Sequence, residues 1–215
     1  MFRTSLFILM ALGGLAAHGG VIQCPDSTYA SIPIAGVTDG TASSCGNANV
    51  FATQSFAATP GDGSVAVDVL ELYLNQALTG VAPSGYLLTE GSAVQFAGFT
   101  VPGGGTLSFD WLSSFEEGGV GALFYILNGD LTVLELIVPD GRGLPGGANS
   151  GSETVTLLAG VNTFAFGAVS LVPEEKLAGP FLLADPQLTL TNMAVNASGV
   201  PEPATYALTG LALAG

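Results

Sequence analysis

The sequence predicts an all-β protein: an antiparallel β-sandwich of the jelly-roll type, preceded by a helical signal peptide and followed by an apolar segment. Short runs rich in Val, Phe, Leu and Thr are separated by turn residues, with 31 Gly and 12 Pro among 215 residues. Several runs alternate, so that Leu107, Phe109 and Trp111 face one way and Ser108 and Asp110 the other. Hydrophobic residues make up 48% of the chain, which is ample for a core.

Nine segments have the length and composition of strands, and their spacing is typical of a sandwich. They are Thr28–Ile34, Asn49–Phe56, Ala93–Val101, Thr106–Leu112, Ala122–Leu127, Leu131–Val138, Glu153–Leu158, Thr163–Leu171 and Phe181–Thr191. The pair Asn128-Gly129 predicts a tight hairpin between the fifth and sixth segments, because both residues accept positive φ. Further turns are expected at Pro102–Gly105, Pro139–Gly141 and Ala159–Asn162.

One stretch departs from the β pattern. Its apolar residues share a helical face, and they are Val67, Leu70, Leu74 and Leu78. A short helix over Val67–Leu78 is therefore predicted, although the alternation of Val65, Val67 and Val69 also fits a strand.

The first residues have the layout of a secretory signal peptide, predicted over 1–19. Arg3 precedes an apolar run at Leu6–Leu12, and small residues follow, with cleavage expected after Ala17 or Gly19. The alternatives are a membrane anchor or a buried helix. The apolar run is much shorter than the ~20 residues that span a bilayer, so the signal peptide is favoured.

The charge balance excludes several classes of function. The chain has 3 basic and 17 acidic residues, and loss of Arg3 with the signal peptide would leave only Arg142 and Lys176 as cations. Nucleic acids are bound mainly through Lys and Arg, so no nucleic-acid partner is expected. The single histidine, His18, lies at the cleavage region, so the mature chain would lack a Ser–His or Cys–His pair. We expect no enzyme.

Cys24 and Cys45 are the two cysteines of the chain. In an exported protein an even pair predicts a disulfide, which closes a loop of about 20 residues and contributes roughly 3 kcal/mol. The alternatives, metal binding or redox chemistry, lack further thiolates and a Cys-x-x-Cys spacing.

The C-terminal region, 200–215, carries a short motif followed by an apolar stretch. The motif residues are Val200, Pro201, Glu202, Pro203, Ala204 and Thr205. Two prolines around a glutamate fix an extended, accessible segment. The region resembles the PEP-CTERM sorting signal of Gram-negative bacteria, in which Pro-Glu-Pro precedes a membrane helix and a terminal arginine cluster. The resemblance implies processing by an exosortase-type enzyme, transient contact with the inner membrane, and transport to the cell surface or the exopolysaccharide matrix.

The region departs from that family pattern in two ways. From Ala204 to Gly215 a helix would span about 18 Å, whereas the hydrocarbon core needs ~30 Å. The arginine cluster is absent from this sequence. Two expectations stay open: the sequence is truncated, or the protein is released without an anchor.

A second resemblance covers roughly residues 85–192. The order of several short segments is similar to β-sandwich ectodomains common among PEP-CTERM proteins, most of which have no assigned activity. These segments are Thr89–Ala93, Phe99–Val101, Gly105–Trp111, Phe115–Glu117 and Phe181–Asp185. The resemblance implies a sandwich ectodomain, which we place at 20–199.

Acidic residues offer a weak calcium site. The candidates are Asp110, Glu116, Glu117 and Asp185, because calcium prefers carboxylate and carbonyl oxygens. Related ectodomains carry an Asn-Asp pair where this chain has Gly121-Ala122, so a solvated acidic loop is the favoured interpretation. No other cofactor is expected.

Two further hypotheses concern sugars. Glu116 and Glu117 suggest a glycosidase pair, but adjacent residues on a strand point to opposite faces. Trp111, Tyr125 and Phe115 suggest a sugar-stacking platform, although Trp111 shares the face of Leu107 and Phe109 and is expected in the core.

These observations predict an exported surface or matrix protein of a Gram-negative bacterium with a structural or interaction role. The alternative is an extracellular carbohydrate-binding module, stabilised by calcium if the site exists, with extracellular polysaccharide as its partner.

Overall fold

The computed structural model describes residues 24–50, 56–59, 63–115, 120–138, 147–176 and 186–198. The predicted signal peptide and the Pro-Glu-Pro motif lie outside these residues. No helix within the described ranges is both long and apolar enough to cross a bilayer.

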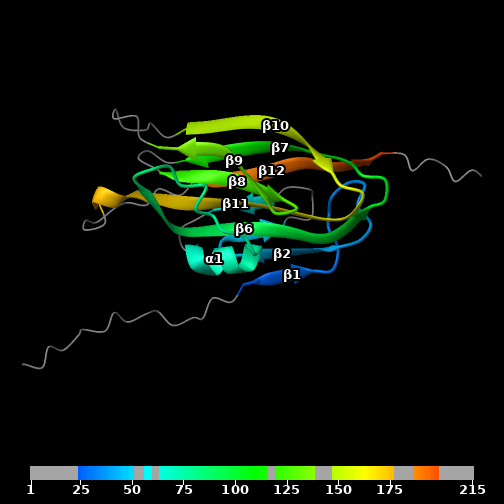
Figure 1. The fold of residues 1–215 in the computed structure, drawn as a ribbon, viewed down its shortest axis with the longest axis horizontal. Coiled ribbons are helices and arrows are strands. Elements are labelled where there is room, and N and C mark those ends of the chain that lie inside the picture. Colours follow the sequence, from blue (N-terminus) through cyan, green and yellow to red (C-terminus); the bar gives the residue numbers. More distant parts are fainter. Residues whose placement is uncertain are drawn as a thin grey trace, which may run out of the picture.

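Two antiparallel sheets pack face to face, which confirms the predicted all-β sandwich (Figure 1). Sheet A has the strand order β1-β2-β6-β11-β8-β9, and β5 pairs with β6; its strands are β1 (Ser27–Tyr29), β2 (Thr41–Cys45), β5 (Val65–Ala66), β6 (Tyr86–Val101), β8 (Gly121–Leu127), β9 (Asp130–Ile137) and β11 (Gly160–Pro173). Sheet B has the order β10-β7-β12-β4-β3; its strands are β3 (Ala48–Val50), β4 (Phe56–Ala58), β7 (Gly105–Phe115), β10 (Gly147–Leu157) and β12 (Gln187–Ala197). A 3₁₀ turn, η1 (Glu174–Lys176), follows β11.

The main core lies between the sheets and is built on aromatic side chains. Phe96, Phe164 and Phe166 of sheet A meet Phe109 of sheet B, with Phe109 and Phe164 ring centroids 5.4 Å apart. Each such ring buries 150–250 Å², which makes aromatic residues the largest apolar contribution to a core of this size. The alternating residues of β7 and β12 supply the opposing face.

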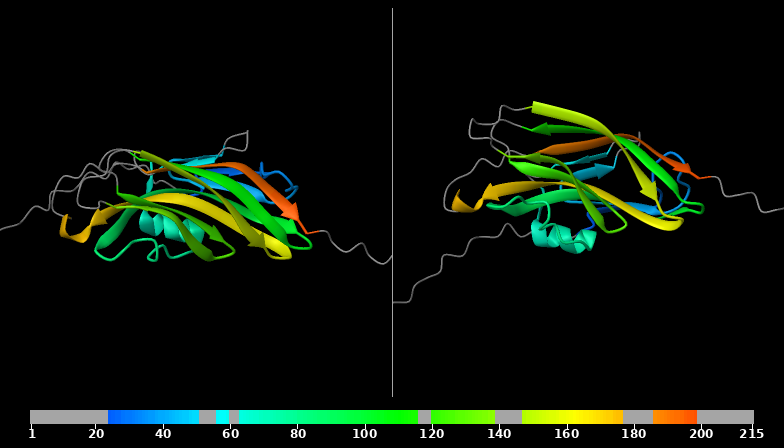
Figure 2. Two further views of the ribbon diagram at one scale, coloured as in Figure 1. Left: turned by 90° about the horizontal axis from the view of Figure 1, so that it is seen from above. Right: turned by 45° about the horizontal axis from the view of Figure 1, so that its top comes forward.

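A second apolar layer covers the outer face of sheet A. Helix α1 (Val67–Leu74) lies against β6, as Figures 1 and 2 show, and its Leu70 and Leu74 pack on Ala93 and Phe124 of the sheet. Sheet A is therefore buried on both faces in its centre. This explains why β8, with six consecutive buried residues, does not alternate like β7.

The helix is shorter than its apolar spacing predicts. It begins at Val67, as expected, but ends at Leu74 instead of Leu78, because Asn75 takes the left-handed conformation with φ 51° and terminates the helix. Leu78 is nonetheless fully buried, and its backbone N–H donates to the Glu71 carboxylate at 2.6 Å. The apolar period indicated burial correctly beyond the last helical turn.

The predicted hairpin is confirmed. Asn128 and Gly129 have φ of 52° and 91°, and Leu127 pairs with Asp130 across the turn. Positive φ at both central residues is the type I′ arrangement, which matches the twist of the flanking strands.

Several strand boundaries differ from the prediction. The strand expected at Thr28–Ile34 ends at Tyr29, and Ile32 and Ile34 instead enter the core from an irregular segment. The strand β2 was missed because Thr41–Cys45 is composed of small residues, which give little apolar signal. The strand expected at Asn49–Phe56 is replaced by the separate short strands β3 and β4.

Three long strands extend well beyond their predicted bounds. β6 starts at Tyr86 rather than Ala93, β10 starts at Gly147 rather than Glu153, and β12 continues to Ala197 rather than ending at Thr191. In β10 the added residues are small or polar, whereas the extensions of β6 and β12 contain register irregularities that break the period-2 alternation.

Candidate binding groove

The outer face of sheet A has a part that α1 does not fill. Strand pairing aligns four residues of this part in one cross-strand row: Ser43 of β2, Gln95 of β6, Ala165 of β11 and Ile126 of β8. The neighbouring row, Cys45–Ala93–Gly167–Phe124, lies in the apolar layer packed around the helix. The first row therefore forms a floor beside the helix.

Two cavities open along this floor and meet at Gln95. The larger, about 720 Å³, lies towards the chain's N-terminal strands and is lined by Cys24, Pro25, Ser43, Val69, Leu72, Tyr73 and Gln95. The smaller, about 300 Å³, lies between the end of α1 and the β8–β9 hairpin, and its polar side chains are Asn75, Gln76, Gln95, Asn128 and Thr163. We call the combined feature the amide groove, because Asn75, Gln76, Gln95 and Asn128 supply most of its polar groups.

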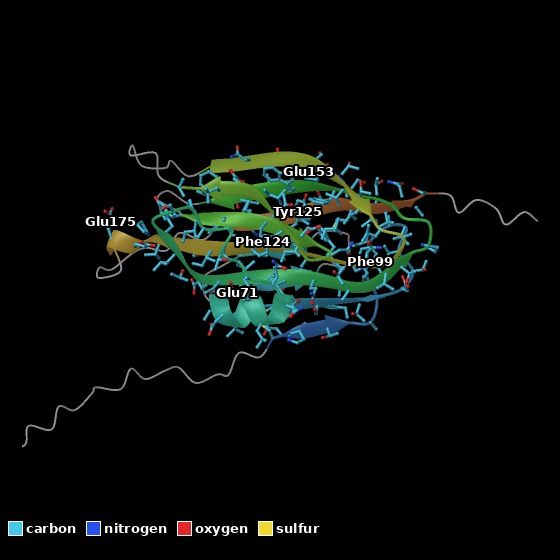
Figure 3. All side chains as sticks on the ribbon, in the orientation of Figure 1. Glu71, Phe99, Phe124, Tyr125, Glu153 and Glu175 are labelled. Atoms are coloured by element: carbon cyan, nitrogen blue, oxygen red, sulfur yellow. A yellow bond between two sulfur atoms is a disulfide. The ribbon has the colours of Figure 1, made fainter. Side chains whose placement is uncertain are left out.

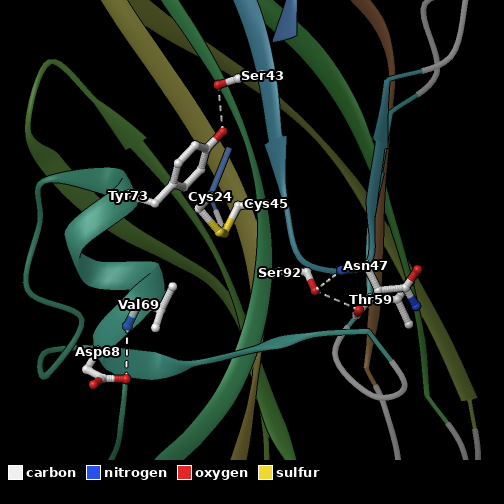
Figure 4. Close-up of a disulfide and its surroundings, with 9 residues drawn as sticks. All are labelled: Cys24, Ser43, Cys45, Asn47, Thr59, Asp68, Val69, Tyr73 and Ser92. Atoms are coloured by element: carbon white, nitrogen blue, oxygen red, sulfur yellow. Dashed lines mark hydrogen bonds between the residues drawn. A yellow bond between two sulfur atoms is a disulfide. The ribbon is translucent and has the colours of Figure 1, made fainter. Parts of the chain in front are cut away.

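Tyr73 forms the wall of the larger cavity (Figure 4). Its hydroxyl lies 2.8 Å from Ser43 Oγ, and in Figure 4 the ring points towards Ser43 with the Cys24–Cys45 disulfide drawn next to it. Burial raises the pKa of Tyr73 to about 12, against the smaller opposing effect of the Ser43 hydrogen bond. The phenol is thus neutral at physiological pH and is held in position by the hydrogen bond with Ser43.

Gln95 and Gln76 present side-chain amides to the groove. Gln95 is half-buried, and no described residue hydrogen-bonds its side chain. Among the described residues, the Gln76 side chain makes one long contact, from its Nε2 to the carbonyl of Ala77 at 3.5 Å. Two amides with open hydrogen-bonding capacity therefore lie on the same surface.

Asn128 closes the far end of the groove and is held rigidly. Its Nδ2 donates to Asn162 Oδ1 at 2.9 Å, and its Oδ1 accepts from the backbone N–H of Thr163 at 2.8 Å. Asn162 is buried and in turn bonds Leu158 and Gly160 through its own amide. Such a satisfied polar network fixes the hairpin against β11.

The groove combines hydrogen-bonding groups with small apolar surfaces and lacks charge. None of the described residues that line it is ionised at neutral pH. Such a surface favours uncharged ligands with many hydroxyl groups, because an anion would find no cation there and the chain carries a net charge of −14.

The predicted site residues lie elsewhere. Asp110 is on the outer face of sheet B, where hydrogen bonds from Asn192 Nδ2 at 2.7 Å and Ser152 Oγ at 2.5 Å hold the pKa of its carboxyl below the ordinary value. The other calcium candidates, Glu116, Glu117 and Asp185, lie outside the described residues, as do the motif residues from Val200 to Thr205. Within the described ranges, no three acidic, His or Cys side chains gather as a metal site would require.

The aromatic residues proposed as a sugar platform do not share an exposed surface. Tyr125 is buried in the main core against Phe109 and Phe164. The half-buried Trp111 packs against that core, as its parity predicted, and its indole lies over Gly151 of β10. The aromatic residue that lines the candidate site is the half-buried Tyr73 instead.

Sequence reasoning missed Tyr73 and Gln95 because the groove is assembled from five elements. Tyr73 falls within the predicted helix Val67–Leu78 and Gln95 within the predicted strand Ala93–Val101, and neither was singled out. No local motif joins them. Only the pairing of β2, β6, β11 and β8 beneath α1 places them together.

No family model matches the chain, and no curated protein matches it in sequence. Among solved structures, it is similar to a family 35 carbohydrate-binding module (CBM35) from Paenibacillus barcinonensis, with 19% identity, a TM-score of 0.27, and coverage of 65% of this chain and 93% of the other. It is also similar to the K1 cleaved adhesin domain of Lys-gingipain from Porphyromonas gingivalis, with 16% identity, a TM-score of 0.33, and coverage of 80% and 83%.

A third likeness is to the secreted serine protease VesC from Vibrio cholerae, with 11% identity and a TM-score of 0.30. It covers 62% of this chain but only 28% of the protease. At such identities and TM-scores, the three likenesses carry no argument about function.

Proposed function

We propose that this chain is an exported, non-catalytic binding protein that holds neutral extracellular polysaccharide in the amide groove. The observation that carries the proposal is the pair of open amides, Gln76 and Gln95, beside the half-buried ring of Tyr73 on an uncharged surface. Sugar rings offer hydroxyls to amides and a C–H face to an aromatic ring, so this combination suits them.

The shape of the groove supports a chain-like ligand. Cavities of about 720 Å³ and 300 Å³ meet at one residue, so a ligand that fills both must extend past Gln95. An oligosaccharide of several units meets this requirement, whereas a single sugar would occupy one cavity only.

Export is supported by the disulfide. Cys24 and Cys45 are bonded across the edge of the groove, and disulfides persist mainly in oxidising compartments. The bond also ties the segment before β1 to β2, beside Ser43. The binding surface thus depends on a bond that is stable outside the cytoplasm.

The test is titration of the secreted chain with a panel of neutral and uronic-acid polysaccharides by calorimetry or affinity electrophoresis. We expect binding to a neutral polysaccharide, with affinity lowered about tenfold in Gln95→Ala or Gln76→Ala by the loss of hydrogen bonds. Gln187→Ala is the matched control, because Gln187 lies on sheet B and bonds Ser114 instead.

Three outcomes would overturn the proposal. The first is an absence of binding to every neutral polysaccharide in the panel. The second is an equal loss of affinity in Gln187→Ala and Gln95→Ala. The third is hydrolysis of a polysaccharide by the purified chain, which would make it an enzyme.

We further propose that the chain reaches the surface through its PEP-type motif, on the strength of the sequence from Val200 to Thr205. Replacing Pro201 and Pro203 by Ala should shift the protein from the surface or matrix fraction to the membrane fraction, as measured by cell fractionation. An unchanged distribution would rule out this sorting route.

A further inference from the structure

The four outermost strands of the two sheets differ in how well they are protected against pairing with another chain. β1 and β3 are each 3 residues long, and β9 carries the charged residues Asp130 and Glu135 among its 8. β10 is 11 residues long, contains neither Pro nor Lys, and has Glu153 as its one charged residue. Short length, charge and Pro are the usual protections of an edge strand, and β10 lacks most of them.

The free backbone groups of β10 are identified by its contacts with β7. The Asn149 N–H donates to Ser113 Oγ at 3.1 Å, and the Asn149 carbonyl accepts from the same hydroxyl at 3.4 Å, so Asn149 is directed towards β7. Backbone groups of successive residues in an antiparallel strand point to opposite sides. The N–H and C=O groups of Ala148, Ser150, Ser152, Thr154 and Thr156 therefore point away from β7, where no described strand pairs with them.

We propose that two copies of this chain associate by antiparallel pairing of their β10 strands about a two-fold axis at Ser152. This joins the two B sheets into one continuous sheet. A two-fold axis perpendicular to the sheet keeps the polar outer faces of both copies on the same side. The proposal is independent of the amide groove, which lies on sheet A.

The register centred on Ser152 is self-complementary. Ser152 then lies opposite its own copy, Ser150 lies opposite Thr154, and Glu153 lies opposite Gly151. All five outward-directed residues of each strand are paired, which gives about ten backbone hydrogen bonds between the copies. The two Glu153 carboxylates avoid each other, and like charges placed directly opposite would oppose pairing.

Trp111 gives an independent reason for this register. Its Nε1 is buried and has no hydrogen-bond partner among the described residues, and a Cβ placed on Gly151 would lie 2.7 Å from it. The indole N–H thus lies above the β10 residue that faces Glu153 of the second copy. In Figure 3, Glu153 lies on β10 near the upper edge of the molecule. In this register the second copy's Glu153 lies opposite Gly151, the β10 residue next to this N–H, so its carboxylate is brought near an N–H that has no acceptor among the described residues.

Net charge opposes association and gives it a signature. Each copy carries a formal charge of −14, so the two repel at low ionic strength. Salt screens this repulsion over about 8 Å at 0.15 M. The dimer should therefore strengthen as salt is added, unlike an association held by ion pairs.

The first experiment is sedimentation analysis of the secreted chain over a concentration series at low and moderate salt. We expect a monomer–dimer equilibrium that shifts to dimer with salt. Ser152→Pro removes an outward N–H and should weaken the dimer at least tenfold, whereas Ser152→Ala keeps the N–H and should not. A chain that is monomeric at every concentration and salt overturns the proposal.

The second experiment tests the register and does not depend on the fold tolerating proline. In Ser152→Cys the two Cα atoms would lie about 5.5 Å apart, within disulfide range, so mild oxidation should yield a covalent dimer. In the matched variant Ser150→Cys, the two thiols would be offset by about 14 Å along the strands and should stay unlinked. Equal linking of both variants, or of neither, contradicts the proposed register.

Discussion

The outer faces of the two sheets differ in how far other elements cover them. On sheet A, Ala93, Phe124 and Val169 are fully buried beneath α1 and the segment that follows it. On sheet B, the outward residues of β7, β10 and β12 are almost all Ser, Thr, Asn or Gln, with Asp110 among them and no cover from any described element.

This difference in cover explains where candidate binding surfaces lie in this sandwich. Sheet A gains stability from its helix, and the helix edge creates the amide groove at the boundary of covered and uncovered rows. The outer face of sheet B is polar, and its long edge strand β10 offers backbone groups rather than a cavity. The first surface suits a ligand and the second another strand.

Truncating one large apolar residue on each outer face should reveal the largest difference between the two sheets. Phe124→Ala, at a site with 0% exposure, should lower the free energy of unfolding by about 3–5 kcal/mol through lost burial and a cavity. Leu112→Ala on sheet B, where the side chain is 48% exposed, should cost under about 0.5 kcal/mol. Urea denaturation measures both. Equal losses would mean that the outer face of sheet B is covered.

A second pair of variants isolates the contribution of the helix. Leu70 is 0% exposed and Leu72 is 82% exposed on the same helix, so Leu70→Ala should cost about 2–5 kcal/mol and Leu72→Ala almost nothing. The side chains are identical and the helix propensity changes equally. If both variants are equally stable, α1 does not pack on sheet A as described.

High pH should affect the sheet A side selectively. The pKa of Tyr73 is raised to about 12 by burial, so the folded state favours the neutral phenol. The stability that the neutral phenol contributes is fully present below the pKa of tyrosine in the unfolded chain, about 10. It is lost as the pH rises from there through the folded-state pKa of about 12. Thermal melting across this range should show the loss, and Tyr73→Phe should abolish that component. A Tyr73 that ionises near pH 10 would contradict its burial.

Low pH should have a smaller effect, on the sheet B side. Hydrogen bonds from Asn192 and Ser152 lower the pKa of the Asp110 carboxyl in the folded state. The contribution of Asp110 to stability is therefore present above the unfolded-state pKa, about 3.9, and is lost as the pH falls through the lower folded-state pKa. NMR titration of the carboxyl carbon should show this pKa moving up towards the ordinary value in Asn192→Ala. An unchanged titration would show that the Asn192 bond is absent in solution.

The sequence predicts the fold better than it predicts the candidate site. The alternation of Leu107 and Phe109 and the turn at Asn128-Gly129 correctly indicated a sandwich and a hairpin, because both depend on neighbours in the sequence. The strand β2 and the end of α1 were not predicted. The small residues of β2 have no strong preference of their own, and Asn75 ends the helix through a backbone conformation that apolar spacing does not encode.

Patterns between neighbouring residues in the sequence do not predict the candidate site. The aromatic residues noted in the sequence, Trp111 and Tyr125, were used for packing, and Tyr73 was left to form the groove. Which aromatic is accessible depends on which layer covers it, and that is a property of the packed sheets.

By itself the sequence determined the fold class, the paired cysteines, the scarcity of basic residues and the presence of the Pro-Glu-Pro motif. These follow from composition and short-range spacing. The tertiary structure alone decided that α1 covers part of one sheet face, that Gln76, Gln95 and Tyr73 line one groove there, and that β10 is the edge of sheet B among the described strands. The reason is that strand order and layer packing join residues far apart in the sequence, as in the bond from the Val195 N–H to the Ala35 carbonyl, and no local pattern carries that information.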